Sequence, residues 1–277
     1  GAVSKTIQDI VRETREKRPM VHAITTRVTG NDCANIILAA YGAPTMAQDT
    51  REVEEITALS DALVLNLGAL RAQEAMLLAG KKANELGHPI VLDPVAAGAS
   101  FLRGETCRKL LHELRIAVIR GNASEIRALA LGSETTLGVE VNALDKVTED
   151  NLEASAEMVR AFSRRVGAVV ALTGEIDLVT DGTQTAVLRG GCEMMSRITG
   201  AGCMLTALTG AYCGANPDRP FAAAVAAVAV MDACGEAAYE RVREAMEGTA
   251  SFRTRLLDAV SLLNEKDLET RLRLQLL

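Results

Sequence analysis

Aromatic residues are scarce in this chain, whose 277 residues include four Phe, three Tyr and no Trp. Hydrophobic residues nevertheless make up 48% of the sequence, so the core must be built from Ala, Val, Leu, Ile and Met. Such a composition suits closely packed layers of helix on sheet. The length is compatible with one large α/β domain or with two small ones, and it does not decide between them.

An excess of positive charge is also missing. The net charge is −6 and the pI is near 5.3, and no run of like charges occurs. Nucleic acid is therefore excluded as the main partner, because binding a phosphate backbone requires a basic face. The six cysteines include no Cys-x-x-Cys pair and no nearby His at metal-ligand spacing, which argues against a zinc site and a disulfide framework. Free thiols are typical of a reducing cytoplasm, and we predict that location.

Long apolar runs fit for a membrane are lacking as well. Residues 1–18 carry interspersed charges and no apolar segment of the signal-peptide type. The uncharged stretch 198–217 holds four glycines, three threonines, Asn216 and Pro217, which make it a poor membrane span. We therefore expect no membrane partner.

Strand and helix patterns alternate from end to end. Continuous apolar runs, typical of parallel strands covered on both faces, occur at 62–66, 89–92, 116–119 and 168–172. Asp181-Gly182 predicts a hairpin between two further strands. The sequence thus predicts one α/β domain over residues 1–277, with a mostly parallel central sheet, helices on both faces and a small antiparallel hairpin. Other expected elements are an opening helix to about 17, a strand at 20–24, a short extended piece at 44–46 and a loop at 131–144. Helices are expected at about 31–40, 69–86, 105–114, 151–165, 219–240 and 251–263, and further helices begin near 52, near 124 and after the glycine turn at 200–202.

A glycine turn, Gly200-Ala201-Gly202-Cys203, precedes one of these helices. Glycines there let backbone N–H groups converge, and the first N–H groups of a helix lack intrahelical partners. Such a turn can hold a phosphoryl group or a developing oxyanion. The same pattern is also common where a loop simply packs closely on a helix. It is neither a dinucleotide fingerprint nor a Walker A loop.

Polar residues follow the predicted strands. Asp93, then Arg120 with Asn122 and Glu125, and then Thr173 stand where successive strands end. Ligands of open α/β sheets lie beyond these carboxyl ends. Two carboxylates to organise Mg²⁺, a guanidinium and an anion-binding turn are what metal-assisted phosphoryl transfer requires.

Each of these residues also has an ordinary interpretation. Asp93 can cap a turn with Pro94, and Asn122 can cap a helix in whose first turn Glu125 is a favourable acid. His22 on an apolar strand is more often a core histidine, and Met46 more often fills a core. The joint appearance of the polar residues at strand ends favours the functional interpretation.

Several motifs, in order along nearly the whole chain, resemble hydroxyethylthiazole kinases. They are Val21-His22-Ala23-Ile24-Thr25, Asn31-Asp32-Cys33-Ala34-Asn35, Leu65-Asn66-Leu67-Gly68, Val91-Leu92-Asp93-Pro94-Val95-Ala96-Ala97-Gly98-Ala99, Arg120-Gly121-Asn122-Ala123-Ser124-Glu125-Ile126 and Thr199-Gly200-Ala201-Gly202-Cys203-Met204-Leu205. The resemblance implies a ribokinase-like fold and a homotrimer. It also implies transfer of the ATP γ-phosphate to the hydroxyethyl group of 4-methyl-5-(2-hydroxyethyl)thiazole in thiamine salvage.

The resemblance also implies roles for individual residues. Arg120, Thr173 and Asn122 would contact ATP, and Asp93 and Glu125 would organise magnesium. Met46, Gly200, His22 and Thr26 would bind or wall the thiazole between neighbouring subunits. Cys203 would be catalytic, together with the backbone of Ala201 and Gly202.

Two departures from the family pattern stand out. Thr26 occupies a position where the family usually has asparagine, so its contact to the thiazole is expected to be shorter or bridged by water. The segment Leu137-Gly138-Val139-Glu140-Val141 replaces a Lys-Gly-Val-Asp-Ser-like sequence, which weakens a role for that loop around ATP.

Cys203 stands where related kinases carry an aspartate base. A helix N-terminus lowers a thiol pKa, so the hypothesis is that Cys203 orients the alcohol and accepts its proton late.

Three alternatives stay open: a kinase for a hydroxymethylpyrimidine or a sugar, a hydrolase with Cys203 as nucleophile and His22 as base, and a non-catalytic binding protein for thiamine precursors.

Overall fold

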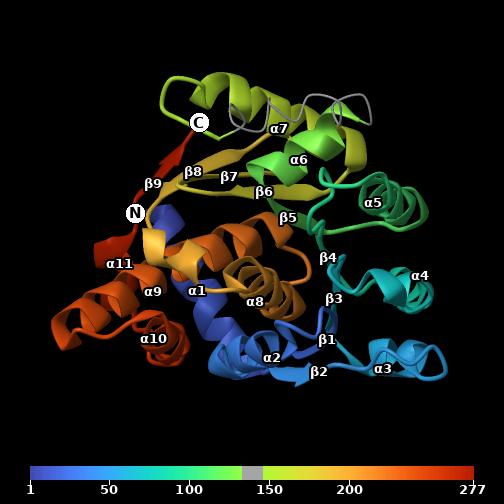
Figure 1. Cartoon of the computed structure of the whole chain (residues 1–277), viewed down its shortest axis with the longest axis horizontal. Coiled ribbons are helices and arrows are strands. Elements are labelled where there is room, and N and C mark those ends of the chain that lie inside the picture. The colour runs from blue at the N-terminus through green and yellow to red at the C-terminus, as the bar shows by residue number, and fades with distance from the viewer. Residues whose placement is uncertain (133–145) are drawn as a thin grey trace.

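The protein is described by a computed structural model that covers residues 1–132 and 146–277. In this part of the chain, nine strands form one sheet in the order β2-β1-β3-β4-β5-β6-β7-β8-β9 (Figure 1). The predicted α/β architecture with a mostly parallel sheet is confirmed. That residues 1–277 form a single domain stays a prediction. Most of the predicted loop at 131–144, including Leu137 to Val141, lies outside the described residues.

The parallel part of the sheet contains six strands, from β2 at one edge to β6. They are β1 (Met20–Ile24), β2 (Ala43–Thr45), β3 (Ala62–Asn66), β4 (Ile90–Asp93), β5 (Val118–Asn122) and β6 (Val169–Thr173). β1 and β3 have the predicted bounds, and β4, β5 and β6 lie within three residues of theirs. These strands are apolar on both faces because helices cover both sides.

The antiparallel part is larger than predicted. β7 (Ile176–Thr180) and β8 (Thr185–Arg189) pair as expected and are joined by Asp181 to Gln184. A third antiparallel strand, β9 (Leu274–Leu276), pairs with β8. The expectation of a small hairpin was therefore incomplete, because a three-residue strand at the end of the chain carries little periodic signal.

Helices cover the two faces of the sheet in separate groups (Figure 1). One face carries α3 (Val53–Leu59), α4 (Gln73–Leu86), α5 (Phe101–Glu113), α6 (Ala123–Leu131) and α7 (Leu152–Val166). The other carries α1 (Ala2–Lys17), α2 (Gly30–Ala39), α8 (Ala201–Ala215), α9 (Pro220–Ala245), α10 (Thr249–Ser261) and α11 (Glu265–Arg271). Strand residues alternate between two hydrophobic cores: Val64 packs with the α8–α9 group, whereas Leu63 and Leu65 pack with the α4–α5 group.

Several helix starts differ from the sequence predictions. α2 begins at Gly30 without a side-chain cap, so the predicted capping by Asn31 or Asp32 was wrong, and Asp32 instead accepts from Arg253 Nε at 2.7 Å. α5 begins four residues early because Ser100 caps it by accepting from the N–H of Arg103. A 3₁₀ turn, Leu70–Ala72, precedes α4. A second such turn, η4 (Glu193–Arg197), and helix α11 were not predicted at all.

One helix among the described residues, α9, is long and apolar enough to cross a membrane by length and composition. Its most apolar window is 72% buried within the protein, as expected for the core helix of an alanine-rich bundle.

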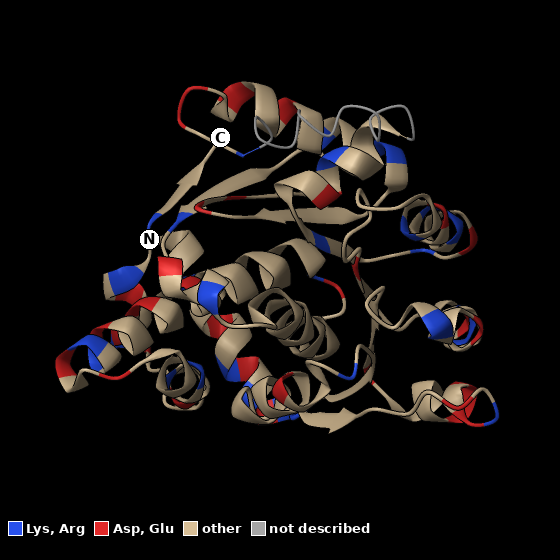
Figure 2. Ribbon diagram, viewed as in Figure 1, with Lys and Arg blue, Asp and Glu red and all other residues tan. Residues whose placement is uncertain are grey.

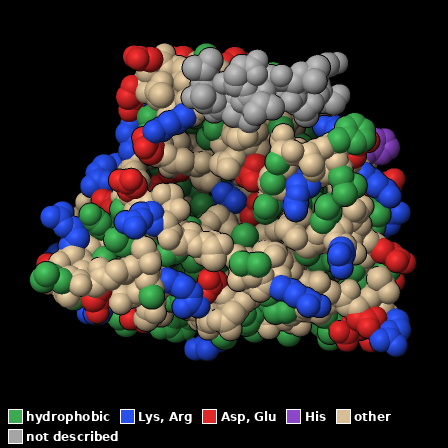
Figure 3. Space-filling model, in the orientation of Figure 1, with side chains coloured by type: hydrophobic (Ala, Val, Ile, Leu, Met, Phe, Trp, Pro, Cys, Tyr) green, Lys and Arg blue, Asp and Glu red, His purple; other side chains and the backbone are tan. Residues whose placement is uncertain are grey.

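Charged residues of both signs lie on the outer helices (Figure 2), and no single sign dominates the visible face (Figure 3).

Candidate active site

The carboxyl ends of the parallel strands open into a cavity of about 920 Å³. Register places Asn122 of β5 beside Thr173 of β6, and Asn66 of β3 beside Asp93 of β4. Nine of the predicted site residues line the cavity: Asp93, Arg120, Asn122, Glu125, Thr173, Gly200, Ala201, Gly202 and Cys203. The expectation that these residues meet at one edge of the sheet is confirmed.

Arg120 is the centre of a buried hydrogen-bond network. Its Nη2 donates to Asp93 Oδ2 at 3.1 Å, its Nη1 to Thr173 Oγ1 at 2.7 Å and its Nε to Thr206 Oγ1 at 2.9 Å. Thr206 Oγ1 in turn donates to Asp93 Oδ2 at 2.8 Å. The guanidinium is thus fixed in orientation by three side chains from β4, β6 and α8.

The network holds the opposite charges of Asp93 and Arg120 side by side in the protein interior. Burial raises the pKa of Asp93 and outweighs the opposing effect of Arg120. Burial opposes the charge of Arg120, but the carboxylates of Asp93 and Glu125 raise its pKa overall. Asp93 Oδ1 is buried and has no hydrogen-bond partner among the described residues. A buried, unpaired oxygen of this kind needs a cation or a donor from a ligand.

The start of α8 has the backbone geometry predicted for an anion cradle. Gly200 is the N-cap with φ +93°, a left-handed conformation that favours glycine, and the helix has no side-chain cap. The first intrahelical bond runs from Met204 N–H to Gly200 C=O, which leaves the N–H groups of Ala201, Gly202 and Cys203 for a ligand. A Cβ atom on Gly202 would lie 2.8 Å from Arg120 Nη2, so only glycine lets the helix approach the guanidinium this closely.

Cys203 is partly buried beside this cradle, and its Sγ accepts from Asn66 Nδ2 at 3.2 Å. Burial raises the pKa of the thiol, and the charge of Asp93 raises it further. The expectation of a pKa lowered by the helix N-terminus was wrong, because desolvation and a neighbouring carboxylate outweigh the helix end. Cys203 is therefore a neutral thiol at pH 7.

Asn122 and Glu125 form a capping box at the start of α6. Asn122 Oδ1 accepts from the N–H of Glu125 at 2.8 Å, and Glu125 Oε1 accepts from the N–H of Asn122 at 2.9 Å. Glu125 Oε2 also accepts from the N–H of Ala96 at 2.8 Å. The ordinary interpretation of these two residues as a helix cap therefore holds, and the same bonds fix the Glu125 carboxylate at the cavity wall.

The predicted thiazole residues His22, Met46 and Thr26 lie outside the lining of this cavity. His22 is fully buried, with Nδ1 bonded to Thr57 Oγ1 and Nε2 to the Ala47 carbonyl, both at 2.8 Å. Burial lowers its pKa, so the ring is neutral. Both ring nitrogens are occupied, which removes His22 as a base for Cys203.

Among residues 1–132 and 146–277, no group of three or more His, Cys, Asp or Glu side chains is arranged to hold a metal ion. Asp93 and Glu125 nevertheless fit Mg²⁺, because that ion usually takes one or two carboxylates and completes its shell with water and phosphate oxygens. The unpaired Asp93 Oδ1 supports this fit.

Several residues of the cavity were missed by sequence reasoning. Thr206 lies three residues after Cys203 and so on the same side of α8, a spacing from which its role was predictable. Asp177 and Asp232 also line the cavity, from β7 and α9. Asp232 had no sequence signal, since it lies within an alanine-rich helix.

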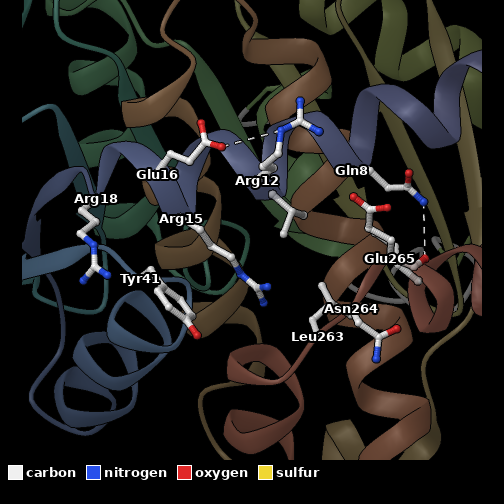
Figure 4. Close-up of a pocket in the computed structure, with 11 residues that line it drawn as sticks. Gln8, Arg12, Arg15, Glu16, Arg18, Tyr41, Leu263, Asn264 and Glu265 are labelled. Carbon is white, nitrogen blue, oxygen red and sulfur yellow. Dashed lines mark hydrogen bonds and ion pairs between the residues drawn. The ribbon is translucent and has the colours of Figure 1, made fainter.

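A second hollow, of about 420 Å³, lies between α1 and the loop before α11 (Figure 4). It contains none of the predicted site residues. Arg12 is held there by Glu16, and Gln8 donates to the Glu265 carbonyl, as the dashed lines show. Arg15 lies over the ring of Tyr41, 5.1 Å from its centroid. We therefore assign this hollow no part in catalysis.

Comparison with known proteins gives consistent relatives. The model of the hydroxyethylthiazole kinase family matches residues 11–266. The hydroxyethylthiazole kinase of Clostridium acetobutylicum is 46% identical over 256 residues, covering 92% of this chain and 93% of that protein. The enzyme of the same name from Desulfovibrio desulfuricans is 46% identical, with 95% of each chain covered.

Solved structures agree with this relationship. The hydroxyethylthiazole kinase protein of Pyrococcus horikoshii is 34% identical and superposes with a TM-score of 0.86 over 99% of both chains. A ribokinase-like superfamily protein of Enterococcus faecalis, only 11% identical but with a TM-score of 0.63, shares the fold. This chain belongs to the hydroxyethylthiazole kinase family and has a ribokinase-like fold.

Proposed function

We propose that this protein transfers the γ-phosphoryl group of ATP to the hydroxyethyl group of 4-methyl-5-(2-hydroxyethyl)thiazole, a step of thiamine salvage. The observation that carries the proposal is the meeting of Arg120, Asp93 and the free N–H groups of Ala201 and Gly202 at one end of the cavity. Membership of the family supports the choice of acceptor.

In the proposed mechanism, the start of α8 and Arg120 bind the transferring phosphoryl group from two sides. Phosphoryl transfer has a loose transition state, so positioning and electrostatic stabilisation provide most of the acceleration. The N–H groups of residues 201–203 point at oxygens that gain charge as the bond breaks. Thr206 and Thr173 keep the guanidinium in place throughout.

Asp93 and Glu125 would hold Mg²⁺, whose charge would offset that of the phosphate oxygens. Cys203, as a neutral thiol, orients the acceptor hydroxyl and does not act as a general base at neutral pH. Asn66 fixes the position of the sulfur.

The thiazole site is proposed to lie between subunits of a homotrimer, near Met46 and Thr26. β2 is an edge strand of the sheet, and its neighbour α2 carries the exposed apolar side chain of Leu38. Val28 is 73% exposed in the loop after Thr26. Apolar residues exposed beside an open strand edge support a subunit contact there. His22 is buried, so it would support the residues of this site from behind without contacting the thiazole.

We propose a cytoplasmic location, because the free cysteines and the buried apolar helix α9 suit a soluble enzyme.

The proposal is tested by ADP release with the thiazole alcohol, a hydroxymethylpyrimidine and a panel of sugars, with and without Mg²⁺. We expect turnover with the thiazole alcohol to exceed that with every other acceptor by at least about 100-fold, and to require Mg²⁺. Preference for another acceptor, or thiazole binding without ADP release, would contradict it.

Sedimentation of the wild type and of Leu38→Glu tests the trimer, which the new charge should dissociate.

A further inference from the structure

The end of the cavity away from Arg120 is lined by a second group of carboxyl side chains. Asp177, Asp232, Glu175 and Glu193 line this acidic end. Glu236 lies next to it on α9 and is neutralised by Arg273, whose Nη2 is 3.0 Å from Glu236 Oε1. Among the described residues that line the cavity, Arg120 is the one Lys or Arg, and it is paired with Asp93.

Asp177 and Asp232 are in direct contact with each other. Asp177 is 2% exposed, and its Oδ1 accepts from the N–H of Gly174 at 3.0 Å. The Oδ2 atoms of both residues are buried without another hydrogen-bond partner among the described residues. Burial raises the pKa of both carboxyl groups, to about 6 for Asp177. A proton shared between the two Oδ2 atoms satisfies both.

This arrangement leaves one oxygen, Asp232 Oδ1, for a ligand. Within residues 1–132 and 146–277 no side chain or backbone group donates to it. It lies against the Gly190-Gly191 loop, where a Cβ on Gly191 would come within 3.2 Å of it. Gly191 has φ +78° and no side chain, so the loop passes Asp232 without covering it.

We infer that Asp232, held by Asp177, is a specificity-determining residue that accepts a hydrogen bond from the nucleoside part of the phosphoryl donor. The inference rests on the proposed function, since it orients the nucleotide with its phosphates at Arg120. A nucleoside offers two kinds of donor to an acidic oxygen: the ribose hydroxyls and an exocyclic amino group of the base.

The chemistry favours a neutral donor over a free metal ion. Burial raises the pKa of both Asp177 and Asp232, which favours a proton on the pair, and Glu236 has its own arginine. The charged groups that face the pair are Glu236 from α9, Arg273 from the segment before β9, and, across the cavity, Arg120. A hydroxyl or amino donor satisfies Asp232 Oδ1 without adding charge.

The test is a double-mutant cycle in which one change is made in the protein and the other in the nucleotide. Calorimetry measures the binding of each Mg²⁺–nucleotide to the full chain without acceptor. Wild type and Asp232→Ala are each titrated with ATP, 2′-deoxy-ATP, 3′-deoxy-ATP and ITP. We expect Asp232→Ala to weaken ATP binding by about 10-fold, the loss expected for one hydrogen bond to a charged group. With the analogue that lacks the contacted donor, wild type and variant should bind alike.

Glu244→Ala, on the exposed end of the same helix, is the matched control and should bind all four nucleotides as the wild type does. Asp232→Asn, which keeps an acceptor oxygen, should recover part of the ATP affinity. An equal loss for Asp232→Ala with all four nucleotides, or no loss with ATP, would overturn the inference. Because no acceptor is present, this result is independent of whether the thiazole alcohol is the substrate.

Discussion

Asp93 and Asp177 are two buried aspartates at opposite ends of one cavity. Asp93 has a guanidinium as its neighbour, and Arg120 and Thr206 both donate to its Oδ2 atom. Asp177 has another carboxyl group, that of Asp232, and a backbone N–H. Burial raises the pKa of both residues.

The difference lies in what compensates the buried charge. At the Asp93 end, charge is balanced by an arginine that is itself a binding group for phosphate, so the network both compensates Asp93 and serves the reaction. At the Asp177 end a shared proton takes the place of the cation. The first arrangement favours anionic groups of a ligand, and the second favours neutral donors.

The largest expected effect comes from removing the cation at the Asp93 end. Arg120→Met leaves a buried, unpaired carboxylate, so we expect a loss of about 3–5 kcal/mol in the free energy of unfolding and a fall of at least about 1,000-fold in kcat. Urea unfolding and ADP release measure the two effects.

The double variant Arg120→Met with Asp93→Asn serves as the control. It removes the uncompensated charge, so it should recover most of the stability and none of the activity. An ordinary surface substitution changes the free energy of unfolding by less than about 1 kcal/mol. A change that small for Arg120→Met would contradict the account of this end.

A smaller effect is expected from a methyl group placed between α8 and Arg120. Gly202→Ala brings a Cβ to 2.8 Å from Arg120 Nη2 and should displace the guanidinium. We expect kcat/KM to fall by about 100-fold, because displacements near 1 Å have that effect on positioned groups. Steady-state kinetics check this. Gly248→Ala, with nothing within 4 Å of its Cβ, should leave the kinetics unchanged.

At the Asp177 end, the expected effect is on stability and depends on pH. The folded-state pKa of Asp177 is about 6, above its ordinary 3.8, so the folded protein binds the extra proton more tightly. Its contribution to stability is present below pH 4 and is lost as the pH rises through about 6. Asp232→Asn removes a second carboxyl group whose folded-state pKa burial and Asp177 raise well above its ordinary value, so the stability of this variant relative to wild type should rise between pH 4 and 8 by about 1–3 kcal/mol.

Chemical denaturation across that pH range measures the difference. Asp218→Asn, at an exposed position, should show no such trend. A constant difference between Asp232→Asn and wild type at all pH values would refute the shared proton.

The smallest effect is expected at Cys203, which borders the Asp93 end. Because its thiol is neutral and only orients the alcohol, Cys203→Ser and Cys203→Asp should each keep kcat within about 10-fold of the wild type. Alkylation of Cys203 by iodoacetamide, followed by mass spectrometry, should be slow at pH 7 and accelerate above the ordinary thiol pKa. An inactive but correctly folded Cys203→Asp would contradict the orienting role.

The parallel half of the sheet and the Arg120 end of the cavity could be predicted from the sequence. Their signals are local, because they consist of long apolar runs and of the polar residues that follow them. Asp93 and Glu125 were identified this way, and Gly202 was identified from the glycine turn before a helix. β9 and Asp232 were not, because the role of each depends on a neighbour far away in the chain. The thiol pKa of Cys203 was predicted with the wrong sign, since burial and the distant Asp93 outweigh the local helix end.

The most direct test of the central claim is ³¹P NMR of the wild type and Arg120→Lys with Mg²⁺–ATP and the thiazole alcohol. The account predicts that the wild type forms ADP and one new phosphate monoester in equal amounts, and that Arg120→Lys, which keeps the charge but loses the three-way hydrogen bonding, forms the ester at least about 100-fold more slowly. Inorganic phosphate in place of the ester, or an Arg120→Lys rate equal to the wild type, would contradict it.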